Sequence, residues 1–203
     1  MSPKKTHSQT LPEHIVLSLF VAFRFLIGDS TALKFMEVSG RNVLRSFSAL
    51  IFAAPLYVLI QWLQFRGPDF DLSGFLLIFG FFAGYAIAWI MFAYAIFYAW
   101  SIIGPRHNYL VFMPLYNWGR IFFMIIMLPY FVLGSFSVIA GTAAVMVWWI
   151  SLGLGLSYKF YITRKALGAS VFHGILFVLF DVLLVFFVMA LFMQAFGLPG
   201  IPL

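Results

Sequence analysis

One acidic side chain, Asp181, lies within a long apolar segment and is the first candidate for chemistry. A carboxylate near the centre of a bilayer costs at least ~2.5–3.5 kcal/mol, so we expect it to face other helices or to be protonated. Asp181 is then either the titrating group of a proton- or cation-coupled site or a structural hydrogen-bonding residue. We expect no basic residue at its depth, which favours the structural role and predicts that Asp181→Asn folds normally.

His173 precedes Asp181 on the same predicted helix. About 1.5 Å per residue places the two side chains about 12 Å apart along the axis, too far for contact. We therefore expect His173 to lie in the head-group region beside Arg164 and Lys165, and not to act in a proton relay.

A third group of polar residues surrounds the start of a predicted span: Arg106, His107, Asn117 and Arg120. In one interpretation Asn117 caps the helix and Arg120 extends to the head groups within an aromatic belt. In the other, the four residues form a cytoplasmic surface that binds lipid head groups or a partner. A weaker hypothesis is a lipid-modifying enzyme that uses Arg106, His107 and Asn117.

Small residues repeat every four positions at Gly80, Gly84 and Ala88. This spacing includes a G-x-x-x-G pattern, which allows close approach of helices in membranes. We expect these residues to pack against another helix of the same bundle or of a second copy.

Many kinds of chemistry are excluded by the residues that the sequence lacks. It has no cysteine, and its four histidines are too scattered for a metal site. It also contains no phosphate-binding loop, no paired catalytic carboxylates and no hydrolase pattern. We therefore expect no enzymatic activity, no cofactor and no metal.

The composition is typical of an integral membrane protein. Of 203 residues, 64% are hydrophobic and 9% charged, whereas a soluble domain has about 25% charged residues. The net charge of +6 comes from basic residues that flank apolar segments. Anionic lipid head groups explain such residues better than nucleic acid does.

Charged residues divide the chain into five apolar segments long enough to cross a membrane. We predict an all-α bundle within a membrane domain at 46–196, with spans at about 46–64, 74–103, 115–134, 138–158 and 171–196. The uncharged stretch between Arg120 and Lys159 is too long for one span, so we expect a turn at 134–141. A re-entrant hairpin at 115–158, with three full spans, is the alternative.

The distribution of basic residues predicts the orientation. With five spans, Arg66 alone lies on one side and all other lysines and arginines lie on the opposite side. The positive-inside rule then places the N-terminus in the cytoplasm and the C-terminus in the periplasm. We expect an uncleaved multi-pass protein of a bacterial cytoplasmic membrane.

The apolar stretch at 15–27, before the first span, is too short to cross a membrane. Thr10 and Glu13 fit a capping box that starts a helix, and Gly28 and Asp29 interrupt it. We predict two amphipathic helices at 11–45 that lie on the cytoplasmic leaflet, the second beginning near Asp29 and running into the first span. Docking of this pair on the bundle is the alternative. Residues 1–10 and 197–203 are expected to be tails.

Three short motifs resemble those of a family of small, uncharacterised bacterial inner-membrane proteins. They are Ser46-Phe47 with the AAPLY segment at 53–57, the YNW segment at 116–118, and Ala166-Leu167-Gly168. These proteins are in turn distantly similar to the five-span Yip family of Golgi proteins, which bind Rab-type GTPases. The resemblance covers residues 30–190 and implies a five-span protein of the cytoplasmic membrane, with no catalytic residue.

Together these features favour a non-enzymatic accessory or scaffold protein. It would act through helix packing and through contacts with membrane lipids, and with a membrane-protein partner or further copies of itself. The alternative is a small proton- or cation-coupled transporter or channel with Asp181 as the titrating group.

Overall fold

The computed structural model describes residues 10–65 and 72–195. Within these ranges every regular element is a helix. The predicted tails at 1–10, apart from Thr10, and at 197–203 lie outside the described residues. The elements are α1 (Leu11–Leu26), η1 (Ser30–Phe35), α2 (Gly40–Ser46), α3 (Ala49–Phe65), α4 (Leu72–Ile103), α5 (Arg106–Ser135), α6 (Gly141–Ile162), η2 (Thr163–Leu167) and α7 (Val171–Ala195).

Five of the helical segments are long and apolar enough to cross a membrane. They are α2 with α3, then α4, α5, α6 with η2, and α7. The prediction of an all-helical chain with five potential spans is therefore confirmed in length and composition.

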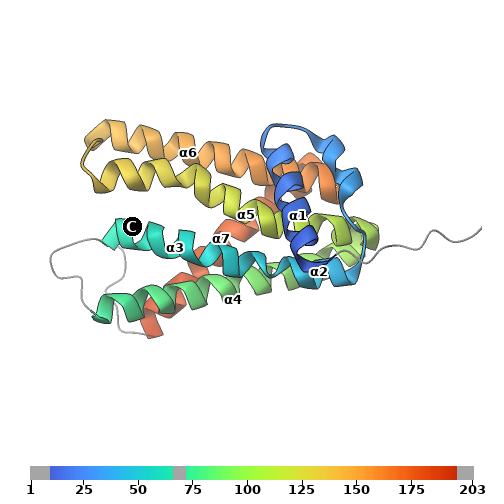
Figure 1. The fold of residues 1–203 in the computed structure, drawn as a ribbon, viewed down its shortest axis with the longest axis horizontal. Coiled ribbons are helices and arrows are strands. Elements are labelled where there is room, and N and C mark those ends of the chain that lie inside the picture. Colours follow the sequence, from blue (N-terminus) through green and yellow to red (C-terminus); the bar gives the residue numbers. More distant parts are fainter. Residues whose placement is uncertain (1–9, 66–71, 196–203) are drawn as a thin grey trace, which may run out of the picture.

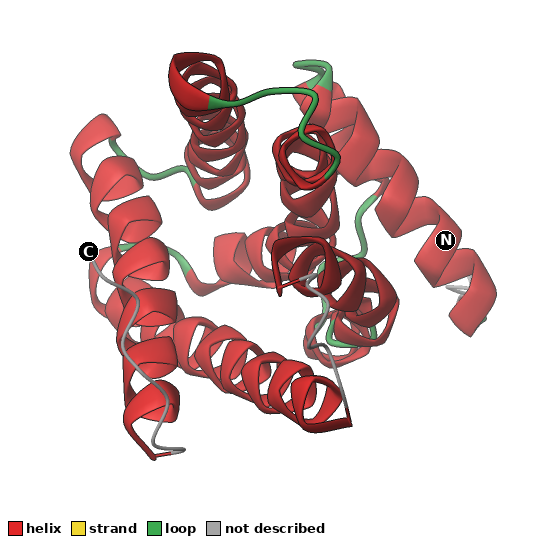
Figure 2. Ribbon diagram, turned by 90° about the vertical axis from the view of Figure 1, so that its left-hand side faces the viewer, coloured by secondary structure: helices red, strands yellow, loops and turns green. Residues whose placement is uncertain are grey.

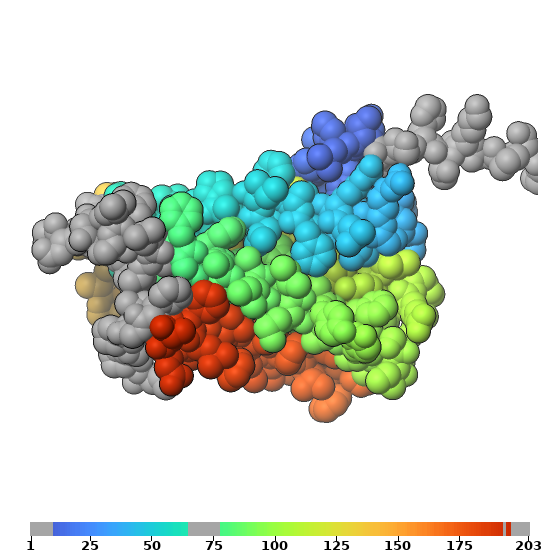
Figure 3. Space-filling view, turned by 90° about the horizontal axis from the view of Figure 1, so that it is seen from below, coloured from blue at the N-terminus to red at the C-terminus, as the bar shows by residue number. Residues whose placement is uncertain are grey.

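The long helices run side by side, and α1 crosses one end of them (Figure 1). The same end carries η1, α2 and the start of α5, whereas the α5–α6 turn lies at the opposite end. Figure 2 shows the helices of the bundle from one end. Helix α5 packs against α1, α2, α3, α4 and α6. Along one face α4 lies beside α7 (Figure 3).

The predicted turn at 134–141 joins two antiparallel helices. The N–H groups of Val138 and Ile139 both donate to the carbonyl oxygen of Leu133, and Ser137 adopts a left-handed conformation with φ 56°. Helix α5 has 30 residues and α6 has 22. At about 1.5 Å per residue, each is long enough for a ~30 Å hydrocarbon core.

Several predicted boundaries were wrong. Helix α5 begins at Arg106, directly after Pro105, and not near residue 115. Proline is tolerated at the start of a helix because a backbone N–H at this position would have no acceptor within the helix. Helix α6 continues to Ile162 and then through a π-helical turn, which ends at Gly168 with φ 72°.

The first helix predicted in the N-terminal segment is present as α1, whereas η1 and α2 stand in place of the second. Asp29 accepts a hydrogen bond from Thr31 N and starts η1, and Ser39 accepts one from Asn42 N and starts α2. The chain between η1 and α2 is extended at Met36 and at Ser39. Lys34, Glu37, Arg41 and Arg45, which would form one charged stripe on a continuous helix, therefore do not share one helix.

Helix α1 faces the bundle with a mixed surface and faces outward with an apolar one. Its buried residues include His14 and Ser18 as well as Val21, Ala22 and Phe25. Its exposed side chains include Leu11, Val16, Phe20 and Phe23, together with Glu13 in the first turn. Such an outer face, apolar beyond its first turn, suits a helix that contacts lipid.

Two glycines of α6 provide a test of the α5–α6 packing. A methyl group at Gly155 would lie 2.6 Å from the ring of Phe123 on α5, whereas one at Gly153 would meet nothing within 4 Å. We predict that Gly155→Ala lowers the stability by about 1–3 kcal/mol through overpacking, and that Gly153→Ala raises it slightly through helix propensity. Thermal unfolding of both variants in the same detergent measures the difference, and equal effects would contradict this packing.

Candidate functional site

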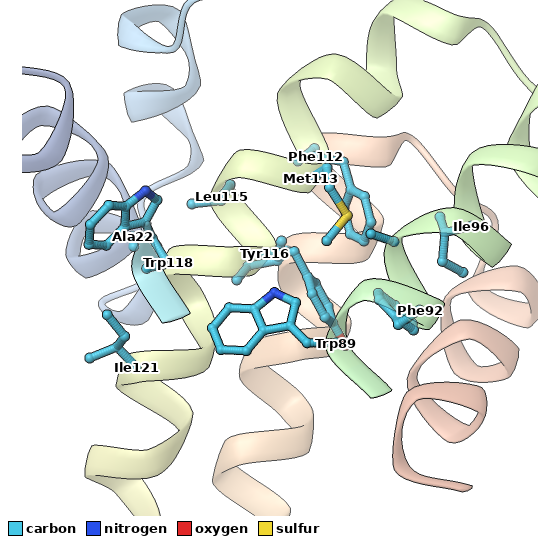
Figure 4. Close-up of a cluster of buried hydrophobic side chains, with 14 of the residues drawn as sticks. Ala22, Trp89, Phe92, Ile96, Phe112, Met113, Leu115, Tyr116, Trp118 and Ile121 are labelled. Carbon is cyan, nitrogen blue, oxygen red and sulfur yellow. The ribbon is translucent and has the colours of Figure 1, made fainter. Parts of the chain in front are cut away.

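The interior of the bundle is built around the first half of α5. Residues 112–121 are all buried, because α1, α2, α3 and α4 surround this part of α5 together with α6. The aromatic side chains of this region pack with those of α4 (Figure 4). The polar residues Tyr116, Asn117 and Arg120 are among these buried residues, so each needs a partner inside the protein.

Asp181 of α7 lies at the centre of a charged cluster formed by Tyr116, Arg120, Lys159 and Asp181. Arg120 Nη2 donates to Asp181 Oδ1 at 2.5 Å. Lys159 Nζ donates to Asp181 Oδ2 at 2.7 Å, and the Tyr116 hydroxyl donates to the same oxygen at 2.8 Å. Both carboxylate oxygens are thus occupied by donors from α5 and α6.

Aromatic rings enclose the guanidinium group of Arg120. Its Cζ lies 4.8 Å from the ring centroid of Trp89, 5.3 Å from that of Phe92 and 5.4 Å from that of Tyr116. Figure 4 shows these three side chains converging between α4 and α5. Such faces attract a cation, so the rings stabilise Arg120 where it is 1% exposed.

The cluster overturns two predictions. Arg120 does not extend to the head groups, and Asp181 does have basic residues at its depth, namely Arg120 and Lys159. The error arose from treating each basic residue as a boundary of a span. Arg120 and Lys159 lie at similar distances from the 134–141 turn, so antiparallel packing of α5 and α6 brings them together.

Asn117 forms a second polar contact, toward α4 and α2. Its Oδ1 accepts a hydrogen bond from Trp89 Nε1 at 2.5 Å, and its Nδ2 donates to Ser46 Oγ at 2.8 Å. Ser46 in turn donates to the carbonyl oxygen of Val43. Asn117 therefore joins helices and does not cap α5, contrary to the first interpretation.

The four residues of the predicted cytoplasmic surface lie in two different environments. Arg106 and His107 are exposed at the start of α5, whereas Asn117 and Arg120 are buried. At about 1.5 Å per residue, His107 and Asn117 are about 15 Å apart along the helix. The four residues do not form one surface, and the three of the enzyme hypothesis do not meet.

The remaining candidates lie on α4 and α7. His173 Nδ1 is 2.9 Å from Ser170 Oγ at the start of α7, away from Asp181. Ala88 is buried, and Gly80 is partly buried. A methyl group at Gly84 would lie 3.1 Å from the ring of Phe192 on α7. This glycine therefore permits close packing within the bundle.

One polar contact, between α1 and α2, was not predicted from the sequence. Asn42 Nδ2 donates to the carbonyl oxygen of Glu37 at 2.6 Å, so its Oδ1 is the acceptor for His14 Nε2. This assigns the proton of neutral His14 to Nε2 and leaves Nδ1 buried with no hydrogen-bond partner. Only the packing of α1 on α2 reveals this role, because the two residues are far apart in sequence.

Comparison with known proteins adds no information on the site. No protein-family model, curated protein or solved structure matches the chain. Within residues 10–65 and 72–195, no group of three histidine or acidic side chains could hold a metal ion.

We predict that substitutions of different residues in the charged cluster lower the stability of the protein by different amounts. Asp181→Asn leaves Arg120 and Lys159 buried without a counter-charge, and we expect a loss of about 3–5 kcal/mol. Lys159→Met keeps the Arg120–Asp181 pair and a similar side-chain volume, so we expect a loss below about 1.5 kcal/mol. Thermal unfolding in lipid nanodiscs measures both variants. Normal stability of Asp181→Asn, our expectation from sequence, would contradict this ion pairing.

The buried His14 predicts that α1 detaches more readily at low pH. Burial and the charge of Arg45 lower the pKa of His14 from 6.5, and burial is the largest effect, whereas Asn42 and Glu37 raise it. The packed state therefore binds the proton less well than the detached state. Its stability is complete above about pH 6.5 and falls below it, by at most about 1.4 kcal/mol per pH unit.

Hydrogen exchange of the α1 amides, corrected for intrinsic rates, measures this change between about pH 7.5 and about pH 5.5. His14→Gln should remove the pH dependence, and the matched variant His173→Gln should retain it. An equal pH dependence in wild type and His14→Gln would rule out His14 as the cause.

Proposed function

We propose that this chain is a non-enzymatic integral membrane protein that acts as an accessory or scaffold subunit. The observation that carries the proposal is the pairing of Asp181, whose two oxygens accept hydrogen bonds from Arg120, Lys159 and Tyr116. A carboxylate with these partners ties three helices together and has little capacity left for a transported cation. Asp181 thus serves the assembly of the bundle.

The outer surfaces of the helices support a role in membrane contacts. Large apolar side chains are exposed along α4, α6 and α7, as well as on α1. In a bilayer such surfaces meet lipid chains or the helices of another membrane protein. We therefore propose membrane lipids as partners, together with a second membrane protein or further copies of this chain.

The placement of the basic residues supports the proposed orientation. The elements that carry Arg24, Lys34, Arg41 and Arg45 lie at the same end of the bundle as the start of α5, which carries Arg106 (Figure 1). By the positive-inside rule this end faces the cytoplasm. We propose a multi-pass protein of a bacterial cytoplasmic membrane with the N-terminus inside and the C-terminus in the periplasm. A relationship to the five-span Yip family remains a prediction.

The rival proposal is a small proton- or cation-coupled transporter or channel with Asp181 as the titrating group. It is supported by the burial of charged residues among membrane helices, which often marks an ion pathway. The pairing of Asp181 favours the scaffold, because protonation of this carboxylate would weaken its contacts with Arg120 and Lys159.

Affinity purification from native membranes tests the scaffold proposal. The protein carries a tag at its N-terminus and is extracted into lipid nanodiscs, and we expect a membrane protein to co-purify in a fixed ratio. The purified chain is also placed in proteoliposomes, where we expect no proton or cation flux above that of empty vesicles. Purification without a partner together with a clear flux would overturn the scaffold in favour of transport.

A variant on the exposed face of α6 tests for contact with a partner without disturbing the fold. Gly153 faces open space on α6, beside the exposed side chains of Trp149 and Ile150. Gly153→Leu should preserve the fold, and its effect on co-purification reports whether this face of α6 contacts the partner.

A further inference from the structure

The charged cluster contains more positive than negative groups. Arg120 and Lys159 both face Asp181, which is the single acidic side chain that forms an ion pair with either cation within residues 10–65 and 72–195. Two further buried nitrogens of Arg120, Nε and Nη1, have no hydrogen-bond partner. With all three side chains ionised, the cluster holds one uncompensated positive charge in the apolar interior, which is unfavourable.

The titratable groups around Lys159 and Arg120 come from three neighbouring helices. Helix α7 contributes Asp181, and α5 contributes Arg120 and Tyr116. From α4 comes Tyr85, whose ring centroid lies 5.9 Å from Arg120 Cζ. The ring of Phe123 lies 4.0 Å from Nζ and carries no titratable group.

The loss of one proton makes the net charge of this cluster zero, and Lys159 can lose it while the other contacts of the cluster persist. Arginine stays protonated in proteins, and protonation of Asp181 would make the cluster more positive. The Tyr116 hydroxyl donates to Asp181, and its loss of a proton would place two negative oxygens in contact. Loss of a proton from Lys159 leaves the neutral Arg120–Asp181 pair, and the neutral amine can still donate to Asp181.

The position of Lys159 also suits proton exchange. Its side chain is 8% exposed, whereas those of Arg120 and Asp181 are each 1% exposed. It lies in the last turn of α6, before η2 continues the helix, and this end of α6 lies toward the end of the bundle that carries α1 (Figure 1).

We propose that the cluster is a proton-binding site in which Lys159 Nζ, and not Asp181, binds and releases the proton. In the release step one N–H bond of the ammonium group breaks, its electron pair stays on Nζ, and the proton passes to water. Arg120 and Asp181 keep their charges throughout. The site does not depend on the scaffold function proposed above, and in a transporter it would replace Asp181 as the titrating group.

Nitrogen NMR of the full chain in lipid nanodiscs tests the proposal. Lysine labelled with ¹⁵N at Nζ is titrated from about pH 6 to about pH 11, and the Lys159 signal is assigned by its loss in Lys159→Arg. The exposed Lys34 and Lys165 serve as references in the same sample. We expect Lys159 to lose its proton at least one pH unit below these references, a tenfold weaker proton affinity.

Arg120→Gln provides the opposing variant. It removes the competing cation and leaves a neutral Lys159–Asp181 pair, so Lys159 should hold its proton at least tenfold more tightly than in wild type. If this variant does not fold, the wild-type titration decides alone.

Three results would overturn the proposal. Lys159 could titrate with the reference lysines. It could stay protonated while the signal depends on chloride concentration, which would show that a bound anion balances the charge. Tyrosinate absorbance could appear with Lys159 still protonated, which would assign the released proton to Tyr85 or Tyr116. Failure to find a partner protein has no bearing on any of these measurements.

Discussion

The structure depends on one constraint, which is that a charge inside a membrane bundle must have a partner there. Asp181 has three: Arg120, Lys159 and Tyr116. Because these donors come from α5 and α6 while the carboxylate comes from α7, satisfying one side chain fixes the relative positions of three helices. Apolar packing alone provides weak discrimination in lipid, since lipid chains are as apolar as leucine. The charged cluster supplies the specificity that such packing lacks.

Helix α5 distributes polar contacts to its neighbours through the spacing of a few residues. Tyr116 and Arg120 are four apart and point to α7, whereas Asn117 reaches Trp89 of α4 and Ser46 of α2. This follows from helical geometry, because residues four apart share a face and adjacent residues do not. Trp89 contacts both sets, since its ring also lies over Arg120. The two groups of contacts therefore stabilise each other across α4 and α5.

The N-terminal elements are also held on the bundle by hydrogen bonds between polar groups. Helix α1 turns His14 and Ser18 inward together with Val21 and Phe25, and it turns other apolar side chains such as Val16 and Phe20 outward. The Tyr158 hydroxyl donates to the carbonyl oxygen of Ala22, and His14 pairs with Asn42. Polar groups thus hold α1 on the bundle while its outer face suits lipid.

The sequence by itself determined the membrane class, the five apolar segments and the turn at 134–141, because these depend on local composition and on length. It also identified Asp181 as the residue to explain. It could not show that Arg120 and Lys159 pair with Asp181, that Asn117 joins α2 and α4, or that His14 is buried. Those partners are far apart in sequence, and a basic residue at the end of an apolar segment looks the same whether it faces lipid head groups or an acidic partner. Only the packing of α5, α6 and α7 decided between them, since it sets which side chains lose water together.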